Sequence, residues 1–169
     1  LKMKKILSLT LALAMLGTAL TGCGSKTAAP ETSVEPTQQT APYQQEQSQT
    51  EKALALINTF ATGDTDTARS LLSDGYIQHN LAYGTGADAF IGSVEYLASA
   101  DVKTTVNNIR AFEDGDKVFL QTIYNFAGAG EQVAFDIFRF DEDGKIAEHW
   151  DVMETIADQS TWQNQNGKF

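Results

Sequence analysis

The stretch "FDIFRFDEDGKIAEHWDV" at residues 135–152 places a carboxyl group and a histidine among aromatic residues. In an extended strand Asp136 shares one face with Ala134 and Phe138, so its nearest side chains are apolar. Because burying an isolated charge is costly, a carboxyl group there must be paired, hydrogen-bonded or protonated. Such a group can act as a general acid or base. A structural hydrogen bond to a helix end or a loop is the alternative, and the local pattern leaves both open.

His149, one of two histidines in the chain, lies on the next predicted strand. Imidazole exchanges protons near neutral pH, which makes His149 the second candidate for proton transfer. Trp150 should point to the opposite face, because neighbouring residues of a strand alternate. An exposed or interface histidine next to Asp151 is the alternative.

The second histidine, His79, precedes Asn80 in "YIQHN" at residues 76–80. This polar pair suits either the mouth of a cavity or a loop that caps a helix. Two histidines and an aspartate could ligate a metal in principle, but their spacing matches no metal-binding motif. We therefore expect no metal site and no cofactor.

Three helices are expected in front of these residues. Ser48 and Glu51 fit a capping box, which predicts a first helix that ends at Gly63. A shorter helix is expected over residues 64–73, and "YIQHN" follows as a short extended or turn-like piece. The run Thr85-Gly86-Ala87-Asp88 is typical of the capped start of a third helix.

After Ala100 the apolar residues recur at every second position, which predicts strands. The expected strands cover residues 103–112, 116–126, 131–141 and 144–153. Short glycine-containing turns join them, so they should form an antiparallel meander. The predicted fold class is therefore α+β, with three N-terminal helices packed on a curved four-stranded antiparallel sheet.

The N-terminal residues are typical of an exported lipoprotein. A basic start and a short apolar run predict a signal peptide over residues 1–22, and Leu20-Thr21-Gly22-Cys23 resembles the bacterial lipobox. That resemblance implies lipid attachment at Cys23, membrane anchoring, and a location in the bacterial cell envelope, outside the cytoplasm. Residues 23–47 are rich in Thr, Gln and Pro and are expected to form a flexible linker. The folded domain is expected over residues 48–169.

The net charge of the chain disfavours a nucleic-acid partner. There are 22 acidic and 12 basic residues, for a formal net charge of −10. An acidic chain without a basic stripe is a poor partner for nucleic acid. We therefore expect a small molecule rather than a nucleic acid as the ligand.

From about residue 50 onward the chain resembles the SnoaL-like group of the nuclear-transport-factor-2-like superfamily. The segments that carry the resemblance are "YIQHN", "GADAF", "FDIFRFDEDGKIAEHWDV" and "NQNGKF". The resemblance implies a cone of three helices against a strongly curved sheet, an internal apolar pocket, and a homodimer through the exposed sheet face.

The family includes polyketide cyclases and lies near ketosteroid isomerases and scytalone dehydratases. The resemblance thus implies acid–base chemistry on a small carbonyl compound, with Asp136 as the general acid/base. Relatives often carry His-x-His where this chain has Gln121 and Ile123, and proline where it has Leu81. The expected catalytic residues are Asp136, His149 and His79, and the expected ligand contacts are Asn80, Gln121, Trp150, Tyr124 and Phe138.

Three functions remain open at this point. The first is an enzyme of the aldol, isomerase or dehydratase type, in which Asp136 takes a proton next to a carbonyl group. The second is a lipid-tethered module that binds an apolar small molecule without catalysis. The third is a structural or dimerisation domain.

Overall fold

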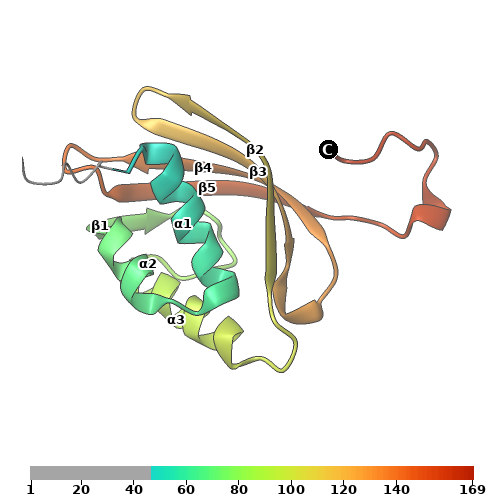
Figure 1. Cartoon of the computed structure of the whole chain (residues 1–169), viewed down its shortest axis with the longest axis horizontal. Coiled ribbons are helices and arrows are strands. Elements are labelled where there is room, and N and C mark those ends of the chain that lie inside the picture. Colours follow the sequence, from blue (N-terminus) through green and yellow to red (C-terminus); the bar gives the residue numbers. More distant parts are fainter. Residues whose placement is uncertain (1–46) are drawn as a thin grey trace, which may run out of the picture. The chain divides into compact units, whose positions relative to one another are not determined.

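The computed structural model describes residues 47–169. The predicted signal peptide, Cys23 and the linker up to residue 46 lie outside the described residues. Three helices pack against one face of a curved sheet, and the C-terminal segment extends away from it (Figure 1). None of the helices in residues 47–169 has the length and apolar character needed to cross a membrane. The helices are α1 (Gln49–Thr62), α2 (Thr65–Leu71) and α3 (Ala87–Ser99), and the strands are β1 (Leu72–Gln78), β2 (Thr105–Asp114), β3 (Lys117–Asn125), β4 (Gln132–Phe140) and β5 (Ile146–Thr155).

Helix α1 begins and ends where the sequence predicts. The Glu51 backbone N–H donates to Ser48 Oγ at 3.1 Å, and the Ser48 backbone N–H donates to the Glu51 carboxylate at 2.8 Å. Gly63 ends the helix in the left-handed conformation, with φ 74°. A Cβ on Gly63 would lie 2.8 Å from the Cβ of Ala98. Glycine therefore ends the helix and also lets it approach α3 closely.

Helix α3 begins near the predicted position, but without the predicted side-chain cap. Its N-cap residue is Gly86, with φ 93° and no side-chain hydrogen bond. The Thr85 hydroxyl instead accepts a hydrogen bond from the backbone N–H of Gln78 at 3.1 Å. The threonine thus ties the start of the helix to the end of β1.

The sheet has five strands in the order β1-β5-β4-β3-β2. Strands β2 to β5 form the predicted antiparallel meander, whereas β1 pairs in parallel with β5. The prediction of a four-stranded, wholly antiparallel sheet is therefore wrong. The helix expected to reach residue 73 ends at Leu71, and Gly75 lies inside the strand that follows. An irregularity between Leu72 and Ile77 breaks the pairing of β1 with β5. The buried positions of β1 do not alternate regularly, so its sequence lacks the period of two that marks a strand.

Irregular pairing also occurs inside the meander. The register shifts at Ile109 in β2, between Asn108 and Arg110, and at Ala147 in β5, opposite Arg139 and Phe140 of β4. Such bulges bend a strand and increase its twist, which fits the curvature of β2 and β3 in Figure 1. We call the sheet face that packs on the helices the inner face and the opposite one the outer face. The core on the inner face includes Leu56, Val94, Val118, Leu120, Phe138 and Ile146.

Candidate functional site

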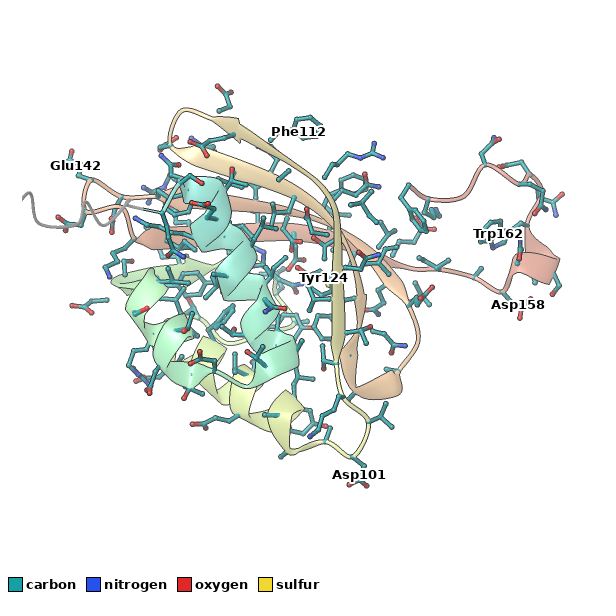
Figure 2. The ribbon with its side chains drawn as sticks, in the orientation of Figure 1. Asp101, Phe112, Tyr124, Glu142, Asp158 and Trp162 are labelled. Carbon is teal, nitrogen blue, oxygen red and sulfur yellow. The ribbon has the colours of Figure 1, made fainter. Side chains whose placement is uncertain are left out.

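A cavity of about 740 Å³ lies between the inner face of the sheet and the helices. Its volume is that of a small-molecule site. Most of its wall is aromatic or aliphatic, and most of its polar groups come from β1, β3, β4 and β5, with Ser93 and Tyr96 added by α3. These polar lining residues include Tyr76, Gln78, Tyr124, Asp136, His149 and Asp151. Tyr124 lies in the middle of the domain, whereas Phe112 lies on the outer face (Figure 2).

Asp136 lies on β4 in the wall of this cavity and is only 4% exposed. Its Oδ2 accepts a hydrogen bond from the Tyr124 hydroxyl at 3.0 Å, and its Oδ1 lies 3.1 Å from His149 Nε2. Both carboxylate oxygens therefore have a partner, which offsets the cost of burial. Burial, followed by the nearby Asp136 carboxylate, raises the pKa of Tyr124, so that Tyr124 keeps its proton.

His149 lies directly opposite Phe138 in the β4–β5 register. The two rings are stacked, with centroids 4.4 Å apart and planes 8° apart. His149 Nδ1 lies 3.0 Å from the side-chain nitrogen of Gln78. The imidazole is therefore held at both ring nitrogens and along one face.

A second carboxyl group, that of Asp151, lies beside the first. Asp151 is the register partner of Asp136 and lies 4.0 Å from His149 Nε2. Its Oδ1 accepts a hydrogen bond from the Asn80 side chain at 2.6 Å. Burial raises the pKa of the Asp151 carboxyl group, and the charge of Asp136 adds to this effect. Two carboxyl groups of the inner face thus lie within 4.0 Å of the same histidine nitrogen.

The structure brings four of the predicted site residues together on the cavity wall, namely Asp136, His149, Tyr124 and Phe138. Asn80 contributes indirectly, through its hydrogen bond to Asp151. The catalytic and binding roles of these residues stay predictions, since the geometry places the groups without showing a reaction.

His79, Trp150 and Gln121 do not line the cavity, contrary to the site roles expected for them, although strand alternation does predict that Trp150 points away from His149. The His79 ring stacks on Trp150 with centroids 4.4 Å apart, and His79 Nε2 lies 3.0 Å from a carboxylate oxygen of Glu148. The side chain of Gln121 donates to the backbone oxygen of Lys168 at 2.8 Å. His79 and Trp150 each follow a residue that lines the cavity, namely Gln78 and His149, and both point to the outer face. Gln121 is three residues before Tyr124 on β3, so strand alternation puts it on the opposite face from that lining residue.

Sequence reasoning missed Gln78 and did not select Asp151 as a site residue. The alternation of strand residues could have pointed to both. Gln78 is two residues from Tyr76, and Asp151 is two residues from His149, so each shares a strand face with a residue of the site. The signal was weak at Gln78, because the segment around it did not look like a full strand.

Asp136, His149 and Asp151 could each offer a ligand atom to a metal, and these atoms lie within 4.8 Å of one another. Each of the three side chains, however, already has a hydrogen-bonding partner outside the trio. The three side chains are therefore part of a wider hydrogen-bonded network.

Comparison with known proteins agrees with this fold. Residues 53–149, more than half of the chain, match the SnoaL-like domain family. No curated protein matches the chain.

Several solved structures share the architecture. An NTF2-like protein of unknown function from Cytophaga hutchinsonii is 16% identical, with a TM-score of 0.56 over 66% of this chain and 94% of that one. An LEH-like epoxide hydrolase from M. tuberculosis is 18% identical, with a TM-score of 0.55 over 63% and 82%. IdmH from Streptomyces antibioticus, proposed to be a polyketide cyclase, is 18% identical, with a TM-score of 0.52 over 64% and 93%.

At these identities the structural likeness establishes the fold alone. The family match is independent of it and covers most of α1, all of α2 and α3, and both Asp136 and His149. The chain therefore belongs to the SnoaL-like domain family, on an NTF2-like fold.

Proposed function

We propose that this SnoaL-like domain binds a neutral, largely apolar carbonyl compound in the cavity and that Asp136 transfers a proton on it. The observation that carries the proposal is the Asp136 carboxylate, which is 4% exposed in the wall of a 740 Å³ cavity, accepts from the Tyr124 hydroxyl and lies 3.1 Å from His149 Nε2. Its fold relatives named as an epoxide hydrolase and a proposed polyketide cyclase also support a small-molecule role.

The charges around the cavity favour a neutral ligand. Within residues 47–169 the lining includes two carboxyl groups and neither lysine nor arginine. An anionic ligand would lose its hydration without gaining a cationic partner, and it would be repelled by Asp136. The aromatic wall, which includes Phe60, Phe90 and Phe126, suits a ligand with apolar rings.

The arrangement suits proton abstraction next to a carbonyl group. Asp136 takes a proton from the carbon beside the carbonyl, and the electron pair of the broken C–H bond forms an enolate. As Asp136 becomes neutral, it attracts its two donors less strongly. The Tyr124 hydroxyl can then rotate toward the enolate oxygen and stabilise it, while the His149 N–H stays beside Asp136. Return of the proton to another carbon of a conjugated enolate completes an isomerisation. In an aldol reaction the enolate carbon instead attacks a second carbonyl, and the alkoxide that forms takes the proton back from Asp136 to give the hydroxyl of the aldol.

A non-catalytic binding domain is the second candidate. Because Tyr124 and His149 satisfy both oxygens of Asp136, the same network also suits a polar patch that only orients a ligand.

Deuterium exchange separates the two candidates. The folded domain in D₂O would be mixed with neutral cyclic ketones of one to three rings, and NMR would follow exchange of the hydrogens beside each carbonyl. We expect catalysed exchange, and we expect Asp136→Asn to lower its rate by about 10²–10⁴-fold, the usual contribution of a general base. Glu148→Gln is the matched control, because Glu148 contacts the other histidine on the outer face. Ketone binding without exchange above the Asp136→Asn level would refute the enzyme proposal and leave a binding domain.

We also propose that the domain is tethered to a membrane of the bacterial cell envelope through Cys23. The lipobox-like Leu20-Thr21-Gly22-Cys23 supports this location, and two or more acyl chains give stable anchoring. Cys23→Ser should move the protein from the membrane fraction to the soluble fraction of its host. Membrane attachment that survives Cys23→Ser would contradict lipid anchoring at this residue.

A further inference from the structure

The hydrogen bonds of the Gln78 side chain identify which nitrogen of His149 carries a proton. A backbone N–H can only donate. The backbone N–H of Asn80 donates to the side-chain oxygen of Gln78 at 3.0 Å. The oxygen of the Gln78 amide therefore faces Asn80, and its NH₂ group occupies the other position.

That NH₂ group lies 3.0 Å from His149 Nδ1 and 3.3 Å from the Tyr76 hydroxyl. An amide NH₂ donates and does not accept, so Nδ1 must be the acceptor. A neutral imidazole that accepts at Nδ1 carries its proton on Nε2. That nitrogen lies 3.1 Å from Asp136 Oδ1, to which it donates.

The same arrangement occurs two residues further on. The backbone N–H of Ala82 donates to the side-chain oxygen of Asn80 at 2.9 Å, which turns the Asn80 NH₂ group to Asp151 at 2.6 Å. Backbone donors of the segment 80–82 thus fix the orientation of two amides, and each amide presents its donor to an ionisable group of the site.

We propose that Gln78 is a positioning residue that holds His149 as the neutral Nε2–H tautomer. This deepens the proposed function and rests on it, since it assigns different roles to the two ionisable groups in contact. Asp136 is the proton acceptor, and His149 is a fixed hydrogen-bond donor rather than the base. A His149 that acted as a base through Nε2, or bound a metal there, would need its proton on Nδ1, where it would face the Gln78 NH₂ group.

Nitrogen NMR measures this tautomer directly. His79→Gln leaves His149 as the single histidine of the domain, so its two ring nitrogens can be assigned without ambiguity. In this background, at a pH where His149 is neutral, we expect a protonated-type signal for Nε2 and an unprotonated-type signal for Nδ1. The opposite pattern would overturn the proposal.

Gln78→Glu tests whether the Gln78 side chain is what fixes the tautomer of His149. The new carboxylate can still accept from the Asn80 backbone, but it presents an acceptor to Nδ1, so we expect Nδ1 to become protonated. Gln132→Glu is the matched control, because it makes the same change on the cavity wall four residues from Asp136 along β4, and it should leave the Nε2–H signals unchanged. A Gln78→Glu variant with a native backbone spectrum and unchanged ring signals would refute the proposal.

Asp136→Asn gives a second measurement if Gln78→Glu does not fold. The new amide can donate or accept at Nε2, so it imposes no tautomer of its own. Gln78 should then keep the proton on Nε2 in a single form, and averaged signals of two tautomers would contradict its role. The ring signals do not depend on the exchange assay. Failure of the enzyme proposal and failure of the Gln78 proposal are therefore distinguishable.

Discussion

The inner and outer faces of the sheet each carry a histidine beside a carboxylate and stacked on an aromatic ring. On the inner face His149 lies 3.1 Å from Asp136 and its ring is 4.4 Å from that of Phe138. On the outer face His79 lies 3.0 Å from Glu148 and its ring is 4.4 Å from that of Trp150. By contacts alone the two groups are nearly the same.

Their surroundings differ. The His149 side chain is 9% exposed and borders a cavity, whereas the His79 side chain is 37% exposed. On the outer face the Arg139 guanidinium also contacts Glu148, and hydrogen bonds from His79 and Arg139 lower the pKa of Glu148. A histidine–carboxylate pair is therefore a candidate site only where it meets a cavity and lacks a permanent counter-charge.

The largest contrast should appear in stability. Phe138 is fully buried on the inner face, whereas Phe135 is 54% exposed on the outer face. Phe138→Ala should lower the free energy of unfolding by about 3–5 kcal/mol, because it leaves a cavity in the core. Phe135→Ala, the matched control, should lower the free energy of unfolding of the monomer, measured at low protein concentration, by less than about 1 kcal/mol. Urea unfolding measures both, and equal losses would show that the two faces are packed alike.

A smaller effect is expected on association. The outer face exposes Phe112, Phe119, Phe135 and Val152, and we propose that a second copy of the chain covers this apolar patch. Light scattering should give the mass of a dimer for the unaltered domain and of a monomer for Phe135→Glu. Glu142→Lys, in the exposed turn between β4 and β5, is a charge-changing control that should stay dimeric. A monomer at high concentration of the unaltered domain would exclude this dimer.

The smallest contrast concerns pH. The raised pKa of Asp151 means that the folded state holds this proton more tightly than the unfolded chain, so the contribution of Asp151 to stability falls as pH rises above 3.8. The lowered pKa of Glu148 has the opposite sign, and its contribution is lost as pH falls below 4.5.

Urea unfolding at several pH values between 3 and 7 would test both signs. Relative to the unaltered domain, Asp151→Asn should become more stable as pH rises. Glu148→Gln should be less stable at pH 7, and this loss should shrink toward pH 3. Parallel pH curves for the two variants would contradict the contrast between the faces.

Much of the fold could be predicted because its signals are local. The capping box at Ser48, the left-handed Gly63 and the alternation in β2 to β5 each depend on residues close in sequence. Strand β1 escaped prediction because its pairing with β5 involves residues about 70 positions away and is irregular after Leu72.

The site, like the fold, could be predicted only where its residues follow a local pattern. The period of two placed Asp136 and His149 on the inner face and Trp150 on the other one. It could not place Gln78, because the role of Gln78 depends on β1 lying beside β5. The same period puts Gln121 and Tyr124 on opposite faces of β3, whereas it could not place His79, which follows the end of β1.

The parallel pairing of β1 with β5 also has a consequence for kinetics. The backbone N–H of His79 donates to the backbone oxygen of His149 at 2.9 Å, and closing a loop of this length costs entropy before the contact forms. Edge strands are among the segments that open locally without global unfolding. Each opening of β1 would withdraw Gln78 and Asn80 from His149 and Asp151 together. Hydrogen exchange at the backbone amide of His79 should therefore report how often the hydrogen bonds from Gln78 and Asn80 to the site break while the rest of the domain stays folded.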